Sequence, residues 1–164
     1  MKPLHRFAAV LVVLGAGLLL ARLPSIHAAE RFVSRVISVH DGDTLTVERE
    51  GRAVRIRLSW VDAAEIDQPD GVEARDWLKA LVLDQEVSVT VKGRSYDRLV
   101  GEVLVDGKSV NAGLLKAGHG WLDPRYSKSR VLKALEAEAR EAKRGLWADQ
   151  NPVAPWRWRK GDRR

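Results

Sequence analysis

Strict alternation of apolar and polar side chains over residues 54–60 constrains the fold more than any other feature of the chain. One face of this run carries Val54, Ile56, Leu58 and Trp60, as a half-buried strand requires. Residues 43–49 show a similar period, and Glu50-Gly51-Arg52 between the two runs has the composition of a tight turn. We therefore expect an antiparallel hairpin, centred near Gly51 and Arg52, in which Asp43 lies opposite Trp60 or Val61.

The periods along the rest of the chain predict an α+β fold with a small sheet or barrel. Further strands are expected over residues 31–40, 87–91 and 99–105, and helices over residues 72–82, 111–117 and 131–142. Asp70 can cap the first helix, with Glu73 three residues later as in a capping box. Gly118 and Gly145 follow the other two helices, where C-terminal caps favour glycine. Three tryptophans are expected in the core: Trp77, Trp121 and Trp147.

Residues 1–29 have the composition of a secretory signal peptide. Lys2 and Arg6 precede an almost wholly apolar run over residues 7–20, and the small residues Ala28 and Ala29 end the segment. The run is shorter than the roughly 20 residues of a spanning helix, but residues 21–23 could extend it into an uncleaved membrane anchor. The sequence thus predicts an exported protein, secreted or periplasmic, with one domain over residues 30–149 and a tail over residues 150–164.

Charge is distributed unevenly along the chain. Of the formal net charge of +6, the leader contributes three basic residues, and residues 156–164 contribute five basic residues and one acid, which leaves −1 for residues 30–155. Attraction to a polyanion must therefore come from local clusters and from the tail. The tail is expected to be irregular. It could contact nucleic-acid or membrane phosphates through its charge and two tryptophans, or dock on the barrel.

Four acidic residues are expected at one end of the hairpin. Asp43 and Asp62 come close together there, with Asp41 and Glu65 just beyond, and such carboxylates repel one another unless a cation lies between them. Oxygen-only ligands favour Ca²⁺ or Mg²⁺, and the chain has no cysteine to offer a thiolate. From spacing alone, a polar turn at residues 41–43 and a solvated loop at residues 65–70 are the more common explanation of the same residues.

Three separated motifs resemble those of the staphylococcal nuclease family. They are Val39-His40-Asp41-Gly42-Asp43-Thr44, then Ile56-Arg57-Leu58-Ser59-Trp60-Val61-Asp62-Ala63-Ala64-Glu65, then Tyr96-Asp97-Arg98 in place of a Tyr-Gly-Arg. The resemblance covers about residues 33 to 147 and includes 106–111 and 145–147. The order and separation of the motifs make it specific, whereas Asp-Gly-Asp alone would be weak.

The resemblance implies a role for each matching residue. Asp43 and Asp62 would bind Ca²⁺, or another divalent ion, through their carboxylates, and Ala63 through its backbone carbonyl. Asp41 would hold the turn and the water ligands of the ion. Glu65 would be the general base, or would orient the attacking water, while Arg57 and Arg98 would clamp the scissile phosphate. Tyr96 and Tyr126 are candidates for substrate binding by stacking on bases, although Tyr126 could instead pack under the last helix.

The family fold is a five-stranded OB-type barrel with helices, which agrees with the order of elements expected here. The implied activity is hydrolysis of phosphodiester bonds in DNA, and also RNA, with little sequence preference, leaving 3′-phosphate and 5′-hydroxyl ends. We expect a monomer with no obligate protein partner. Ala64 and Asp97 depart from the family pattern. There are two alternatives to a nuclease. One is an inactive OB-fold module that binds single-stranded nucleic acid, and the other is a membrane-tethered protein that works through its basic tail.

The distance between Arg57 and Asp62 determines whether both residues can belong to one site. On a straight strand Arg57 would lie about 16 Å from Asp62, too far for both to serve one phosphate site. The chain must therefore curl strongly or turn back after Trp60, as a small barrel allows.

Overall fold

A closed five-stranded barrel with helices at one end makes up the computed structural model, which describes residues 29–123 and 125–163. The barrel strands are β1 (Arg31–Val39), β2 (Thr44–Arg49), β3 (Arg52–Leu58), β5 (Glu86–Ser95) and β6 (Arg98–Val105). They follow the order β3-β2-β1-β5-β6, and a parallel pairing between β3 and β6 closes the barrel. The predicted α+β class and OB-type barrel are confirmed. The predicted signal peptide lies outside the described residues except for Ala29.

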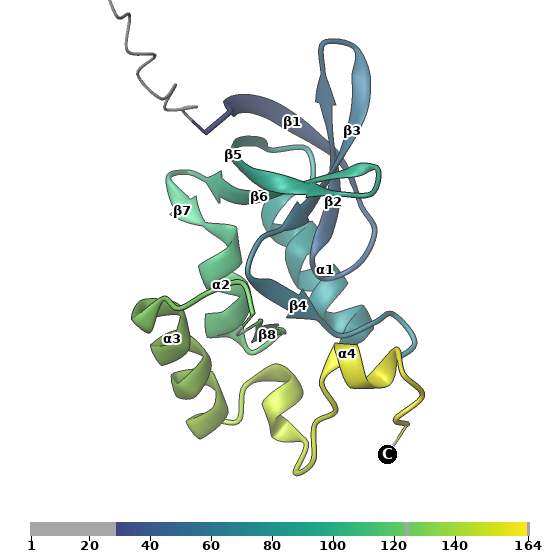
Figure 1. Cartoon of the computed structure of the whole chain (residues 1–164), viewed down its shortest axis with the longest axis vertical. Helices are drawn as coiled ribbons and strands as arrows, with labels where there is room; N and C mark the ends of the chain where they lie inside the picture. Colours follow the sequence, from purple (N-terminus) through teal and green to yellow (C-terminus); the bar gives the residue numbers. More distant parts are fainter. Residues whose placement is uncertain (1–28, 124, 164) are drawn as a thin grey trace, which may run out of the picture.

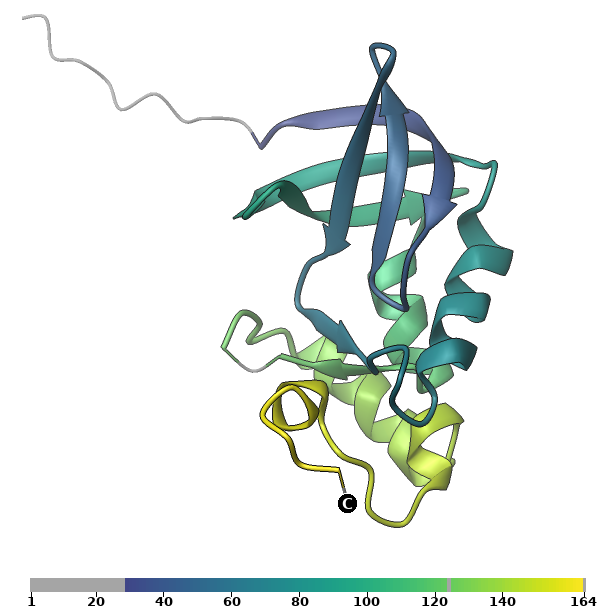
Figure 2. The ribbon, with the colours of Figure 1, turned by 90° about the vertical axis from the view of Figure 1, so that its right-hand side faces the viewer.

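The helices lie beside and below the barrel in Figure 1, and Figure 2 shows the same arrangement from the side. They are α1 (Gly71–Val82), α2 (Val110–Ala117), α3 (Arg130–Glu141), the 3-10 helix η1 (Gly145–Ala148) and the short α4 (Pro155–Trp158). Three shorter strands complete the fold: β4 (Val61–Ala63), β7 (Lys108–Ser109) and β8 (Gly120–Leu122). Among the described residues, no helix is both long and apolar enough to cross a membrane.

The core fills the barrel because alternate strand residues point inward. Val36, Leu45, Val47, Ile56, Val87, Val89 and Val103 are fully buried there, and Leu78, Val82, Leu114 and Leu115 add the inner faces of α1 and α2. A second, smaller cluster joins α3 to η1 through Ala139, Leu146 and Trp147, with Trp121 packed against it. Trp147 is buried as predicted, whereas Trp77 and Trp121 are half-buried at the edges of the two clusters.

The hairpin of β2 and β3 forms as predicted, but its register was predicted wrongly by two residues. Glu50 and Gly51 occupy the turn with φ of 51° and 71°, and Arg49 pairs with Arg52. This is the two-residue turn whose positive φ values match the twist of the strands. Asp43 therefore lies opposite Leu58, whose N–H donates to the Asp43 carbonyl at 2.8 Å, and not opposite Trp60 or Val61.

Asp43 and Asp62 nevertheless meet, because the chain turns back directly after β3. Trp60 has φ of 68°, a conformation that is uncommon for a residue with a large side chain. β4 then leaves the barrel and pairs with β8, where Asp62 lies opposite Trp121. The prediction that the chain turns back near Trp60, which brings Asp62 close to Arg57, is confirmed. The two β4–β8 strands carry three residues each, too few to show a period in the sequence.

The predicted cap of the first helix was wrong. Asp70 stands at the N-cap of α1 with φ of 70°, and its side chain makes no capping hydrogen bond, so no capping box with Glu73 forms. The Asp70 carboxylate is turned instead toward His119, with Oδ2 3.0 Å from the ring Nδ1. This contact ties the start of α1 to the segment between α2 and β8.

Candidate active site

The turn that precedes β2 places the first acidic residues of the site. The Asp43 N–H donates to Asp41 Oδ1 at 3.0 Å, a local bond typical of Asx turns. Gly42 allows the turn to lie against β4 and α1, since a Cβ there would come within 2.6 Å of the Ala63 Cβ and 2.7 Å of the Ala74 Cβ. Only glycine fits this approach, which brings Asp43 next to β4.

Asp43 and Asp62 are almost fully buried, with 3% and 2% of their surface exposed. Asp43 Oδ2 accepts a hydrogen bond from the Ala63 N–H at 3.1 Å, and Asp43 Oδ1 accepts one from the Thr44 hydroxyl at 3.0 Å. The Asp43 carboxylate is therefore held in place by two neighbouring donors. Burying two carboxylates side by side is unfavourable unless a positive group accompanies them.

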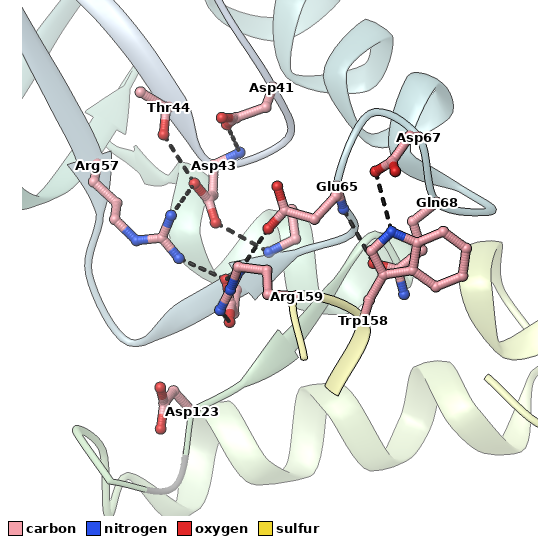
Figure 3. A network of polar contacts seen from close by, with 12 residues as sticks. Asp41, Asp43, Thr44, Arg57, Glu65, Asp67, Gln68, Asp123, Trp158 and Arg159 are labelled. Carbon is pink, nitrogen blue, oxygen red and sulfur yellow. Dashed lines mark hydrogen bonds and ion pairs between the residues drawn. The ribbon is translucent and has the colours of Figure 1, made fainter. Parts of the chain in front are cut away.

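Arg57 supplies that positive group. Its Nη1 lies 2.8 Å from Asp43 Oδ1 and its Nη2 lies 2.6 Å from Asp62 Oδ1, so one guanidinium bridges both carboxylates (Figure 3). The planar fork of an arginine suits such a bridge, because its two terminal nitrogens each face one carboxylate. Burial favours a lower pKa for Arg57, but Asp43 and Asp62 outweigh it and raise the pKa.

The ionised form of the Asp43 carboxyl is destabilised by its surroundings even with Arg57 as its partner. Burial raises its pKa to about 7, Arg57 opposes the rise, and the nearby Asp41 and Asp62 carboxylates add to it. A raised pKa means that the ionised carboxylate is destabilised where it lies. More positive charge in the pocket would therefore be favourable.

The structure brings all nine sequence-predicted site residues to one open pocket of about 850 Å³. The pocket is lined by Asp41, Asp43, Arg57, Asp62, Ala63, Glu65, Tyr96, Arg98 and Tyr126. Arg98 reaches in from the start of β6, with Nη1 3.5 Å from Thr44 Oγ1. Tyr96 is 97% exposed and Tyr126 is 70% exposed, so Tyr126 is not packed under the last helix.

Asp97 does not engage the neighbouring Arg98. Its Oδ2 lies 3.4 Å from Arg55 Nη1, and both of these side chains are exposed. A surface pair of this kind contributes little to stability. The Arg98 guanidinium consequently stays available to the pocket.

Arg159 lines the pocket, and sequence reasoning did not identify it. Its Nη2 lies 2.7 Å from Asp62 Oδ2 and its Nη1 lies 2.5 Å from Glu65 Oε1, which places a second guanidinium across the acidic side of the pocket (Figure 3). The hydrogen bonds to Asp62 are the largest cause of the raised pKa of Arg159. The Trp-Arg repeat of residues 156–159 was the available signal, but nothing in it indicates which acids it meets.

The tail, which was predicted to be irregular, contains a short helix, α4. Figure 2 shows this segment docked below the barrel, and its residue Arg159 lines the pocket.

The donor chemistry of the pocket fits a hard divalent ion. Asp41, Asp43 and Asp62 offer only oxygen atoms, and burial of Asp43 makes added positive charge favourable. Among the described residues, however, no three or more His, Cys, Asp or Glu side chains converge on a point that could hold an ion. Arg57 and Arg159 lie between the carboxylates instead.

Comparisons with known proteins give a consistent result. The model of the family described as "Staphylococcal nuclease homologue" matches residues 55–149. An "Uncharacterized endonuclease" of Escherichia coli O157:H7 is 45% identical over 127 residues, covering 76% of this chain and 83% of that protein. A "Micrococcal nuclease" of Shigella flexneri is 33% identical over 168 residues, covering 95% of each. An "Uncharacterized endonuclease" of Haemophilus influenzae is 30% identical over 154 residues, covering 93% and 86%.

Proposed function

The chain belongs to the staphylococcal nuclease family, and we propose that it is an exported, Ca²⁺-dependent nuclease that hydrolyses phosphodiester bonds of DNA, and also of RNA, with little sequence preference. The nuclease activity itself agrees with the names of the relatives. One observation carries the assignment of the site. Two arginines from different strands, Arg57 and Arg98, line the same open pocket as the acidic residues Asp43, Asp62 and Glu65.

The reaction requires positive charge around the phosphate. A phosphodiester is an anion, and attack by water builds more negative charge on its oxygens, so fixed cations lower the barrier. Arg57 and Arg98 bind and orient the phosphate by forked hydrogen bonds. Asp43, Asp62 and the Ala63 carbonyl would hold a Ca²⁺ ion, which would supply further positive charge and polarise a bound water.

Glu65 acts on the attacking water. Its carboxylate accepts a proton from the water, or holds the water in line, while the new P–O bond forms. The bond from phosphorus to the 5′ oxygen breaks, and that oxygen takes up a proton to become a hydroxyl. The products are a 3′-phosphate and a 5′-hydroxyl end. Tyr96 and Tyr126, both exposed at the pocket, stack on the bases beside the cleaved bond and favour no particular sequence.

The experiment uses residues 30–164 with single-stranded and duplex DNA, in Ca²⁺ or in chelator. We expect Ca²⁺-dependent cleavage, a loss of about 10²-fold or more in kcat/KM for Glu65→Gln, and a comparable loss for Arg57→Lys, because each removes an interaction made in the transition state. Glu102→Gln, a substitution on β6 outside the pocket, is the matched control. Binding of single strands without cleavage in any divalent ion would instead identify an OB-fold binding module.

Export is proposed from the leader. Residues 2–29 combine a basic start, an apolar run and small residues at the end, the pattern of a cleaved signal peptide. The intact mass of the protein recovered outside the cytoplasm should correspond to a chain that begins near Glu30. Recovery of the full-length chain from the membrane fraction would mean that the leader is an anchor.

A further inference from the structure

The segment that follows η1 is bound across the loop that carries Glu65. Ala154 and Pro155 are buried, and the Trp156 ring meets the edge of Trp121 with centroids 5.7 Å apart. The Gln68 side-chain amide donates to the Val153 carbonyl at 2.5 Å. These contacts fix the position of α4 without using any group of the catalytic pocket.

Anchored in this way, α4 delivers Arg159 to the acids. Asp62 Oδ2 lies 2.7 Å from Arg159 Nη2, and Asp62 Oδ1, already bonded to Arg57, lies 3.2 Å from Arg159 Nη1. Arg159 Nη1 also contacts Glu65 Oε1. Both oxygens of Asp62 are therefore engaged by guanidinium groups, and the carboxylate proposed to act on water has the same partner.

This arrangement conflicts with the reaction. An ion bound to Asp62 and a water held by Glu65 need the oxygens that Arg159 occupies. Two cations cannot share these oxygens without strong mutual repulsion, so occupation by Arg159 and occupation by a divalent ion oppose each other.

We propose that residues 150–163 are a built-in inhibitory segment, in which Arg159 takes the place of the divalent ion until the ion and substrate displace it. The inference rests on the proposed function, because the ion that competes with Arg159 is the divalent ion proposed for that site. The apparent affinity for the ion is then lower than the intrinsic affinity of the acids. It equals the intrinsic affinity multiplied by the fraction of molecules in which Arg159 has left the acids.

The outer contacts of the segment are weak enough for release. The pair between Arg163 and Asp67 joins side chains that are 53% and 67% exposed. A pair this exposed contributes little to stability and is screened by salt. The released segment is basic, so the phosphates of a bound polynucleotide would attract it away from the acids.

The experiment measures ion binding without substrate. Calcium binding to residues 30–164 is followed by calorimetry for the unmodified chain, Arg159→Ala and Lys160→Ala. Lys160 is the exposed neighbour of the same charge, so its substitution controls for net charge. We expect Arg159→Ala to bind Ca²⁺ on the order of tenfold more tightly, Lys160→Ala to match the unmodified chain, and Arg159→Ala to cleave DNA faster at limiting Ca²⁺ with kcat at saturating Ca²⁺ unchanged.

Trp156→Ala provides a second route to the same result. It weakens the anchor on Trp121 and leaves every group of the pocket in place, so it should also tighten Ca²⁺ binding. Thermal unfolding of each variant verifies that it is folded. Unchanged or weaker Ca²⁺ binding in Arg159→Ala, no Ca²⁺ binding to any variant, or a fall in its kcat at saturating Ca²⁺ would overturn the inference. Because calorimetry needs no cleavage, a chain that binds Ca²⁺ but lacks nuclease activity would refute the proposed function alone.

Discussion

At the scale of single residues, the pocket is shaped by the burial of two carboxylates that solvent would otherwise stabilise. Asp43 and Asp62 are both nearly inaccessible, and the bridge from Arg57 compensates for part of their desolvation. Asp43 keeps a pKa raised to about 7, chiefly by burial. Buried carboxylates that favour binding of a cation therefore lower the free energy of unfolding while no such ion is bound.

This cost should appear as a pH dependence of stability. The folded chain binds the Asp43 proton more tightly than the unfolded chain, since the pKa falls from about 7 to 3.8 on unfolding. The stability that Asp43 contributes is full below pH 3.8 and is lost as pH rises toward 7. We expect the Tm of Asp43→Asn, relative to the unmodified chain, to be higher at pH 8 than at pH 5 when both are measured in chelator.

Asp84→Asn serves as the control for that measurement, because Asp84 is an exposed acid paired with Arg35 and its removal should change Tm equally at the two pH values. A Tm difference for Asp43→Asn that is the same at pH 5 and pH 8 would show that the buried carboxylate does not titrate in this range.

At the scale of elements, periodicity predicted the long strands and helices, and three-dimensional pairing determined the rest. The barrel strands and α1 to α3 lie where the apolar spacing indicates. The register of β2 and β3 depended on which two residues form the turn, and Glu50-Gly51 and Gly51-Arg52 are both plausible from composition. β4, β8 and α4 have three or four residues each, so they depend on partners distant in sequence and leave no periodic signal.

The turn of the hairpin offers a test of the corrected register. Glu50 adopts φ of 51° at the first turn position, where asparagine is strongly preferred because it tolerates the left-handed conformation. Glu50→Asn should therefore stabilise the chain by about 0.5–1 kcal/mol, measured by urea unfolding. Gly51→Ala, at φ of 71°, should destabilise it by about 1 kcal/mol. If Arg52 occupied the turn instead of Glu50, Glu50→Asn would give no gain.

At the scale of the whole molecule, charge and sequence separation explain what the sequence could not predict about the site. The motifs that identify Asp43, Arg57, Asp62, Glu65 and Arg98 are local, so their convergence follows once the barrel closes. The contacts of Arg159 with Asp62 and Glu65 join residues that are 97 and 94 positions apart. The basic tail and the acidic pocket complement each other in charge, but charge alone does not distinguish this docking from binding to phosphates.

The two parts of the molecule should differ in local stability, and hydrogen exchange can measure the difference. Amides of Val36, Val47 and Val89 lie in a barrel core with no exposed surface and should exchange only by global unfolding. Amides of residues 157–162 donate to carbonyls of residues 154–158 in and beside the short α4, and the buried side chains of the segment include Ala154 and Pro155. We expect these amides to exchange by local opening, with rates at least about 10²-fold faster and independent of low denaturant concentrations.

The same measurement relates local opening to the pocket. If Arg159 leaves the acids whenever α4 opens, Ca²⁺ should increase exchange at residues 157–162 while leaving the barrel amides protected, because the ion binds only the state in which Arg159 has been released. Exchange of α4 that matched the global rate of the barrel would mean that the segment does not open locally. Arg159 could then leave Asp62 only by rotation of its own side chain, and Ca²⁺ would not change the exchange of residues 157–162.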